Sequence, residues 1–142
     1  MTDAESGFGV EVAGVGEFLR LLKERHEERS GWPELGASRE AVCVTRMTDR
    51  RPSSYGFPLV RRYVVAAFAY GPNVVSYRRT TSNVVELPEV ASKLAERQRE
   101  ASEQLRVEIK RGLEKSDLRL PIHEGSLRHP TDARRTRRDD SG

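Results

Sequence analysis

The chain has 142 residues, of which 36% are hydrophobic and 33% charged, and its formal net charge is +3. This length fits one folded domain, and the high polar content indicates that part of the chain lies outside the core. We predict a single α+β domain at residues 8–129, a disordered N-terminus at residues 1–7 and a disordered basic tail at residues 130–142.

The composition also bears on location. The N-terminus is acidic where a secretory signal would be basic, and no apolar run approaches the ~20 residues that a membrane helix needs. The one cysteine, Cys43, lies in the apolar run AVCV and has no partner for an intrachain disulfide. These features predict a cytoplasmic protein without a membrane partner.

The first predicted element is a short strand. Phe8, Val10 and Val12 alternate with Gly9 and Glu11, which is the period-two pattern of a strand, and we expect it at an edge of the sheet. The glycines of this region match neither the dinucleotide-binding nor the P-loop spacing. We interpret them as turn and helix-entry residues.

An amphipathic helix is predicted at residues 15–29. Its apolar side chains recur at helical spacing: Val15, Phe18, Leu19 and Leu22. The sequence SGWP at residues 30–33 ends it, because glycine suits the left-handed cap and proline cannot continue the helix.

Three β-rich runs follow, one at residues 41–47 and two within residues 59–81, on either side of the turn signal Gly71-Pro72-Asn73. Strands in direct succession favour an antiparallel meander. We therefore predict an α+β fold with a three- to four-stranded antiparallel meander sheet covered by two helices, the second long and amphipathic.

The turn signal also predicts a register for the central hairpin. A two-residue connection places Phe68 opposite Tyr77. One face of the hairpin is then the more apolar and is predicted to face the core; it carries Val64, Ala66, Phe68, Tyr70, Val75 and Tyr77. A slip of one residue on one strand would exchange the faces.

A polar loop, TDRRPSSYGFP, separates the first β-rich run from the hairpin. Its mixture of arginine, serine and aromatic residues suits contact with a ligand. The alternative interpretation is a solvated loop with Phe57 turned inward.

The longest predicted element is a helix at residues 88–114. We expect its apolar stripe to be an interaction surface, formed by Leu94, Ala101, Leu105, Ile109 and Leu113. Such a helix is ~40 Å long, whereas a ten-residue strand covers ~33 Å, so one end should overhang the sheet. The overhang would be covered by the segment LRLPIH, which includes a predicted edge strand at residues 118–122, or by the same helix of a second copy.

Catalytic and metal-binding chemistry receive little support. His123, Glu124 and His129 lie close in sequence, but their spacing is not that of a helical zinc motif, and His26 lies on a charged helix face. The apolar neighbours of Cys43 oppose a thiolate nucleophile. We predict no catalytic residue, no metal site and no cofactor.

Arginine is concentrated in the central part of the sequence. Between residues 45 and 85 seven arginines face a single acidic residue, Asp49: Arg46, Arg50, Arg51, Arg61, Arg62, Arg78 and Arg79. Arginines on a sheet face with tyrosines nearby would offer phosphate contacts and stacking surfaces. Binding of nucleic acid or another polyanion is therefore one hypothesis, although exposed strand arginines also keep a sheet edge soluble.

The other hypothesis is a small interaction module without catalytic activity, which assembles with itself or with another protein through the long helix or the sheet. Its basis is the long amphipathic helix. The two hypotheses differ in their expected response to salt, because polyanion binding weakens steeply as salt rises.

Overall fold

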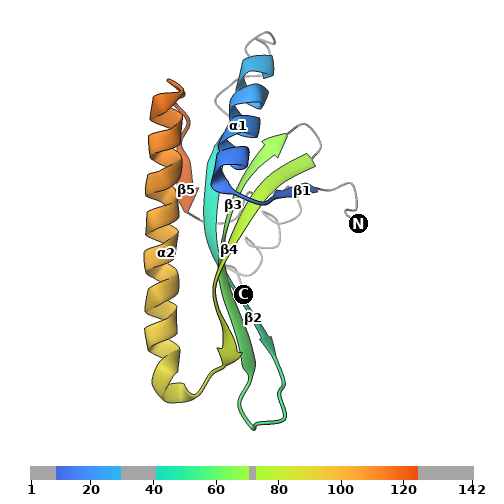
Figure 1. Cartoon of the computed structure of the whole chain (residues 1–142), viewed down its shortest axis with the longest axis vertical. Coiled ribbons are helices and arrows are strands. Elements are labelled where there is room, and N and C mark those ends of the chain that lie inside the picture. Colours follow the sequence, from blue (N-terminus) through green and yellow to red (C-terminus); the bar gives the residue numbers. More distant parts are fainter. Residues whose placement is uncertain (1–8, 30–40, 71–72, 125–142) are drawn as a thin grey trace, which may run out of the picture.

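The structure is a computed structural model in which residues 9–29, 41–70 and 73–124 are described. A five-stranded sheet carries two helices on one face (Figure 1). In chain order the elements are β1 (Gly9–Val12), α1 (Val15–Arg29), β2 (Val42–Arg51), β3 (Leu59–Tyr70), β4 (Asn73–Val85), α2 (Pro88–Lys115) and β5 (Ile122–Glu124).

The sheet is mixed, so the prediction of an antiparallel meander with three or four strands is wrong. The strand order is β1-β4-β3-β2-β5; the three central strands pair antiparallel, but β1 is parallel to β4 and β5 is parallel to β2. The physical reason is that α2 returns the chain to the end of the sheet where β4 began. The strand after such a helix runs parallel to the strand before it, and β2 has the same direction as β4.

The hairpin register differs from the predicted one by two residues. Phe68 lies opposite Val75, and Tyr70 lies opposite Asn73. A shift of two residues leaves each side chain on its face of the sheet. The predicted core face is confirmed for five of its six members, since Val64, Ala66, Phe68 and Val75 are buried and Tyr77 packs against the core. The side chain of the sixth, Tyr70, lies outside the described part of the structure.

The core fills the space between the sheet and both helices. Phe18 of α1 packs edge-to-face on Phe68 of β3, with ring centroids 5.2 Å apart. From α2, Leu105, Ile109 and Leu113 complete this cluster. The helices cover the sheet because both carry their apolar residues on one stripe.

Helix α2 ends in a defined cap that directs the chain into β5. Asp117 has φ 58°, the backbone N–H of Leu118 donates to the carbonyl of Leu113 at 2.9 Å, and the N–H of Asp117 donates to Glu114. These are the two hydrogen bonds of a Schellman motif. Leu118, Leu120 and Ile122 then pack against the core, so the LRLPIH segment does fold back onto the domain.

The premise of the predicted overhang of α2 is wrong, because the sheet is longer than we expected. The helix has 28 residues and β4 has 13. At 1.5 Å and 3.3 Å per residue, respectively, they are about 42 and 43 Å long. The helix and the strand are therefore about equally long, so the difference in length from which we predicted the overhang is absent.

Some predictions fall on parts of the chain that are not described. These are the disordered N-terminus, the basic tail, the helix stop at residues 30–33 and the turn at residues 71–72. Within the described ranges, no helix combines the length and the apolar character needed to cross a membrane.

Candidate functional site

The seven arginines do not form one free basic surface. Arg46, Arg62 and Arg79 point to the helix side of the sheet, whereas Arg61 and Arg78 lie on the opposite, outer face. Each of these five has a carboxylate partner: Arg46–Glu124 at 3.3 Å, Arg61–Asp49 at 2.5 Å, Arg62–Glu86 at 2.6 Å, Arg78–Glu11 at 3.1 Å and Arg79–Glu108 at 2.9 Å. Only Arg50 and Arg51 lack such an ion pair within the described residues.

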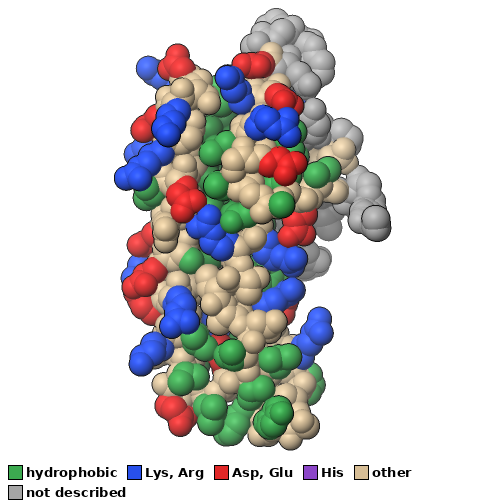
Figure 2. Space-filling model, viewed as in Figure 1, with side chains coloured by type: hydrophobic (Ala, Val, Ile, Leu, Met, Phe, Trp, Pro, Cys, Tyr) green, Lys and Arg blue, Asp and Glu red, His purple; other side chains and the backbone are tan. Residues whose placement is uncertain are grey.

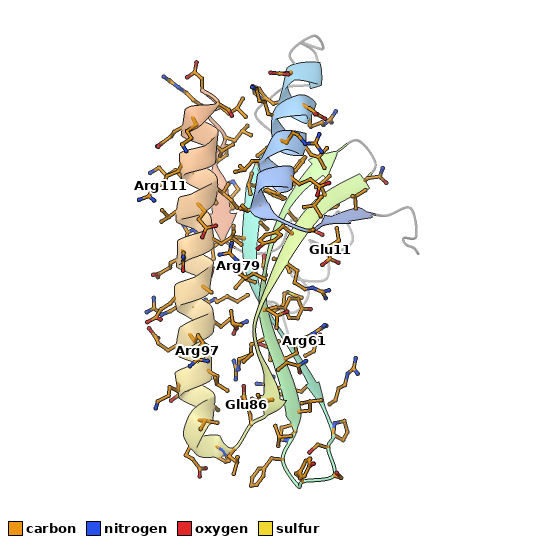
Figure 3. All side chains as sticks on the ribbon, viewed as in Figure 1. Glu11, Arg61, Arg79, Glu86, Arg97 and Arg111 are labelled. Carbon is orange, nitrogen blue, oxygen red and sulfur yellow. The ribbon has the colours of Figure 1, made fainter. Side chains whose placement is uncertain are left out.

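The outer face carries a row of charges around one ring. The guanidinium carbons of Arg61 and Arg78 lie 4.8 and 5.7 Å from the centre of the Tyr63 ring. A hydrogen bond from Arg61 lowers the pKa of Asp49. Figure 3 shows Arg61 and Glu11 among the side chains of this row. Both arginines are thus engaged by the ring and by acidic neighbours.

On the helix side, Arg79 joins β4 to α2. It donates two hydrogen bonds to Glu108, at 2.9 and 3.2 Å, and a third to the hydroxyl of Tyr77 at 3.1 Å. The hydrogen bonds from Arg79 lower the pKa of Glu108. The spacing of residues along the sequence did not indicate this pair, because its members are 29 residues apart.

A buried polar network joins the sheet to α2. Arg62 donates to both carboxylate oxygens of Glu86, at 2.6 and 3.0 Å, and contacts the amide oxygen of Gln98 at 3.4 Å. The Gln98 amide nitrogen donates to the carbonyls of Met47 and Tyr63, at 2.7 and 3.0 Å. Arg62, Glu86 and Gln98 are buried. The network therefore ties β2, β3 and the end of β4 to α2.

The network lies where the hairpin is irregular. The register shifts between Arg62 and Tyr63, and the hydroxyl of Thr81 donates to the carbonyl of Arg62 at 3.1 Å. A bulge interrupts the ladder and leaves a backbone group to be satisfied by a side chain. The burial of Gln98 was not predictable from helical spacing, because it depends on the position of the bulge.

Beyond the network, the loop between β2 and β3 is held in a fixed shape. The Ser53 hydroxyl accepts a hydrogen bond from the N–H of Tyr55 at 3.1 Å and donates to the carbonyl of Phe57 at 2.5 Å. Gly56 has φ 85°, which glycine adopts without strain. This arrangement presents Tyr55 and Phe57 on the surface, and it corrects the alternative that Phe57 turns inward.

The same end of the molecule exposes apolar side chains from three elements. Tyr55 is 75% exposed, Phe57 39%, Val84 45% and Leu87 41%. The N–H of Glu86 donates to the carbonyl of Pro58 at 3.0 Å and so holds the loop beside the start of α2. Figure 2 shows hydrophobic side chains gathered at this end. We call the surface formed by Tyr55, Phe57, Val84 and Leu87 the distal tip.

The residues predicted to form an interaction stripe on α2 lie elsewhere. Leu105, Ile109 and Leu113 are buried in the core, and Ala101 packs against it; Leu94 is half-buried. The stripe is therefore used within the domain and is not offered to a second helix. Residue spacing does not reveal the distal tip, because its members are spread over 33 residues of sequence.

Two hollows lie outside the tip. A cleft of about 520 Å³ separates α2 from β5 and the residues before it, and a smaller one of about 110 Å³ lies on the outer face between Asp49, Arg51 and Asn83. No group of three metal-binding side chains is close enough together in the described ranges to hold a metal ion. Burial raises the pKa of the Cys43 thiol, which opposes its use as a nucleophile.

Comparisons with protein-family models, with curated proteins and with solved structures found no match for this chain.

Proposed function

We propose that this protein is a non-catalytic assembly module whose copies associate through the distal tip. The observation that carries the proposal is the gathering of four exposed apolar side chains at one end of the molecule. Exposed apolar surface of this kind, set among polar residues, is typical of a protein-binding site. Aromatic residues such as Tyr55 and Phe57 are also the usual anchors of interfaces.

The charges around the tip favour a second copy as the partner. Arg50 near the end of β2 and Glu89 in the first turn of α2 are both exposed, and neither forms an ion pair with another described residue. An interface with two-fold symmetry needs a surface that is complementary to itself. Apolar residues flanked by charges of both signs satisfy this requirement.

The first test is the molecular mass of the protein in solution. We expect wild type to form a dimer in size-exclusion chromatography with light scattering, and the dimer to persist at high salt because an apolar contact is not screened. The dimer dissociation constant of the double variant Tyr55→Ser/Phe57→Ser should be at least about tenfold higher than that of wild type. Val10→Ser, which removes a 48% exposed apolar side chain far from the tip, is the matched control.

An exchange of charges tests whether Arg50 of one copy faces Glu89 of the other. Glu89→Lys places like charges together across the axis and should weaken the dimer, whereas adding Arg50→Glu in the same chain should restore it. A monomeric wild type at ~100 μM, far above the ~1 μM of a moderately stable complex, would contradict the proposal.

Polyanion binding has less support, because five of its seven arginines already face a carboxylate. The same chromatography tests it. A monomer that carries nucleic acid at low salt and releases it at high salt would favour polyanion binding over assembly through the tip.

A further inference from the structure

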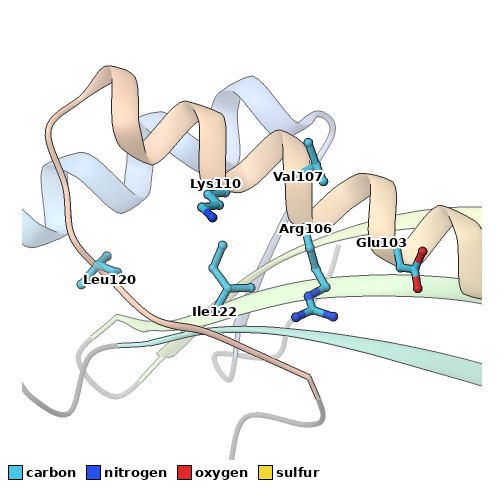
Figure 4. A pocket seen from close by; sticks show the side chains of 6 residues that line it. All are labelled: Glu103, Arg106, Val107, Lys110, Leu120 and Ile122. Carbon is cyan, nitrogen blue, oxygen red and sulfur yellow. The ribbon is translucent and has the colours of Figure 1, made fainter.

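The cleft between α2 and β5 has walls of two different chemical kinds. On α2, the side chains of Glu103, Arg106, Val107 and Lys110 lie along one stripe, at helical spacing. Leu120 and Ile122 form the opposite wall. Figure 4 shows Arg106 and Lys110 pointing from α2 toward the segment that carries Ile122.

Of the three charged side chains that line this cleft, two form ion pairs with described residues and the third does not. Glu103 is paired with Arg99, and Arg106 lies 3.8 Å from Glu124, which is also paired with Arg46 at 3.3 Å. Lys110 is exposed and forms no ion pair within residues 9–29, 41–70 and 73–124. Val107 is 46% exposed beside it. The cleft therefore combines apolar surface with a cation that has no carboxylate partner.

The strand that borders the cleft is an edge of the described sheet. The carbonyl of Pro121 accepts a hydrogen bond from the N–H of Val42 in β2. Successive residues of a strand direct their backbone groups to alternate sides. The backbone N–H and C=O groups of His123, like the carbonyl of Pro121, are therefore directed toward β2. The N–H and C=O groups of Ile122 and Glu124 are directed away from it.

We propose that this cleft binds an extended acidic peptide segment of another protein, which adds to the sheet beside β5. Main-chain hydrogen bonds to Ile122 and Glu124 would fix its register, as in other cases of strand addition. Its apolar side chains would lie against Val107 and Leu120, and a carboxylate would pair with Lys110. A second copy of this edge is a poorer occupant, because it would bring Arg106 and Lys110 against the same two cations.

The probe is a fluorescein-labelled peptide of seven residues, Val-Thr-Glu-Thr-Val-Thr-Glu, with both ends capped, so that its valine and glutamate side chains lie on the same face of an extended chain. We expect saturable binding to the full-length protein by fluorescence anisotropy, and at least about tenfold weaker binding to Lys110→Glu. Lys93→Glu changes an exposed lysine of the same helix outside the cleft and should bind as wild type does. Equal losses in the two variants, or no saturable binding to wild type, would overturn the proposal.

Two further peptides separate the contributions. In one, lysine replaces both glutamates and reverses the charge; in the other, serine replaces both valines and removes the apolar side chains; each should bind at least about tenfold more weakly. Equal binding of the serine peptide would overturn the proposal in favour of non-specific attraction. Bound valine–glutamate peptide should also slow amide hydrogen exchange at Ile122 and Glu124, and unchanged exchange there would refute strand addition.

Discussion

At the scale of single residues, the buried pair of Arg62 and Glu86 is the most sensitive point of the molecule. Glu86→Gln keeps the shape of the side chain but leaves the Arg62 guanidinium charged and unpaired in a buried site. Loss of one partner from a buried ion pair typically costs about 3–5 kcal/mol. We expect a decrease of that size in the free energy of unfolding, measured by urea denaturation.

Two controls separate the lost charge from a general intolerance of mutation at this site. Ser102→Ala removes a hydroxyl of α2 that is buried without a hydrogen-bond partner, so it should leave the stability unchanged or raise it slightly. Arg62→Met/Glu86→Leu removes both charges together and should cost much less than the single change. A double variant as unstable as Glu86→Gln would show that packing, not charge, accounts for the loss.

Glu108 should make the free energy of unfolding depend on pH in the acidic range. Its pKa lies below the ordinary 4.5 because Arg79 donates hydrogen bonds to it. The folded carboxylate therefore holds its proton less tightly than the unfolded one, so its contribution is present above the ordinary pKa and is lost as the pH falls through the lowered value.

We expect the unfolding free energy of wild type to fall more steeply below about pH 4.5 than that of Glu108→Gln, with a difference of about 1 kcal/mol because the pair is only partly buried. Urea denaturation at a series of pH values measures it. Arg79→Gln should flatten the profile in the same way, and parallel profiles for all three proteins would contradict the assignment.

At the scale of elements, the packing of α1 on α2 depends on Gly112. A Cβ at this position would overlap the Cδ1 methyl of Leu19 and lie 3.2 Å from its Cγ. Gly112→Ala gains about 1 kcal/mol of helix propensity, which offsets the displacement of one flexible side chain, so it should be nearly neutral. Gly112→Val adds more atoms and should destabilise the protein by about 1–3 kcal/mol.

A double-mutant cycle identifies the cause. Leu19→Ala alone removes packing, but in the background of Gly112→Val it also removes the overlap. The double variant should therefore be more stable than the sum of the two single changes predicts, as thermal unfolding will show. Additive effects would mean that the two helices adjust without contact between these positions.

The helices were the elements most accessible from sequence, for a physical reason. Helical periodicity is local, and α1 matches its predicted bounds while α2 extends one residue past them. Strand direction and pairing depend on where distant segments meet. The parallel pairing of β1 with β4 and of β5 with β2 was therefore not predictable from the alternation of apolar and polar residues. The pairs Arg62–Glu86 and Arg79–Glu108 join different elements and carry no signal in residue spacing.

At the scale of the whole molecule, the two ends are held together by different forces. The apolar core lies at the end that contains α1 and the C-terminal half of α2, with Phe18, Val44, Phe68 and Ile109 among its members. Toward the distal tip, Val60 is buried, but the main ties between the sheet and α2 are those of the Arg62–Glu86–Gln98 network. Burial of apolar area stabilises a fold without regard to geometry, whereas a polar network is lost when one partner moves.

This difference predicts that the distal end opens before the core. In native-state hydrogen exchange, amides of Val64, Ala66 and Ile109 should exchange only through global unfolding, whereas those of Val60 and Val84 should exchange through a local opening of lower free energy. Glu86→Gln should speed exchange at the distal positions more than at the core. If copies associate through the tip, higher protein concentration should slow exchange at Val84 selectively, because opening then requires dissociation. Uniform exchange along β3 would mean that the network and the core unfold as one unit.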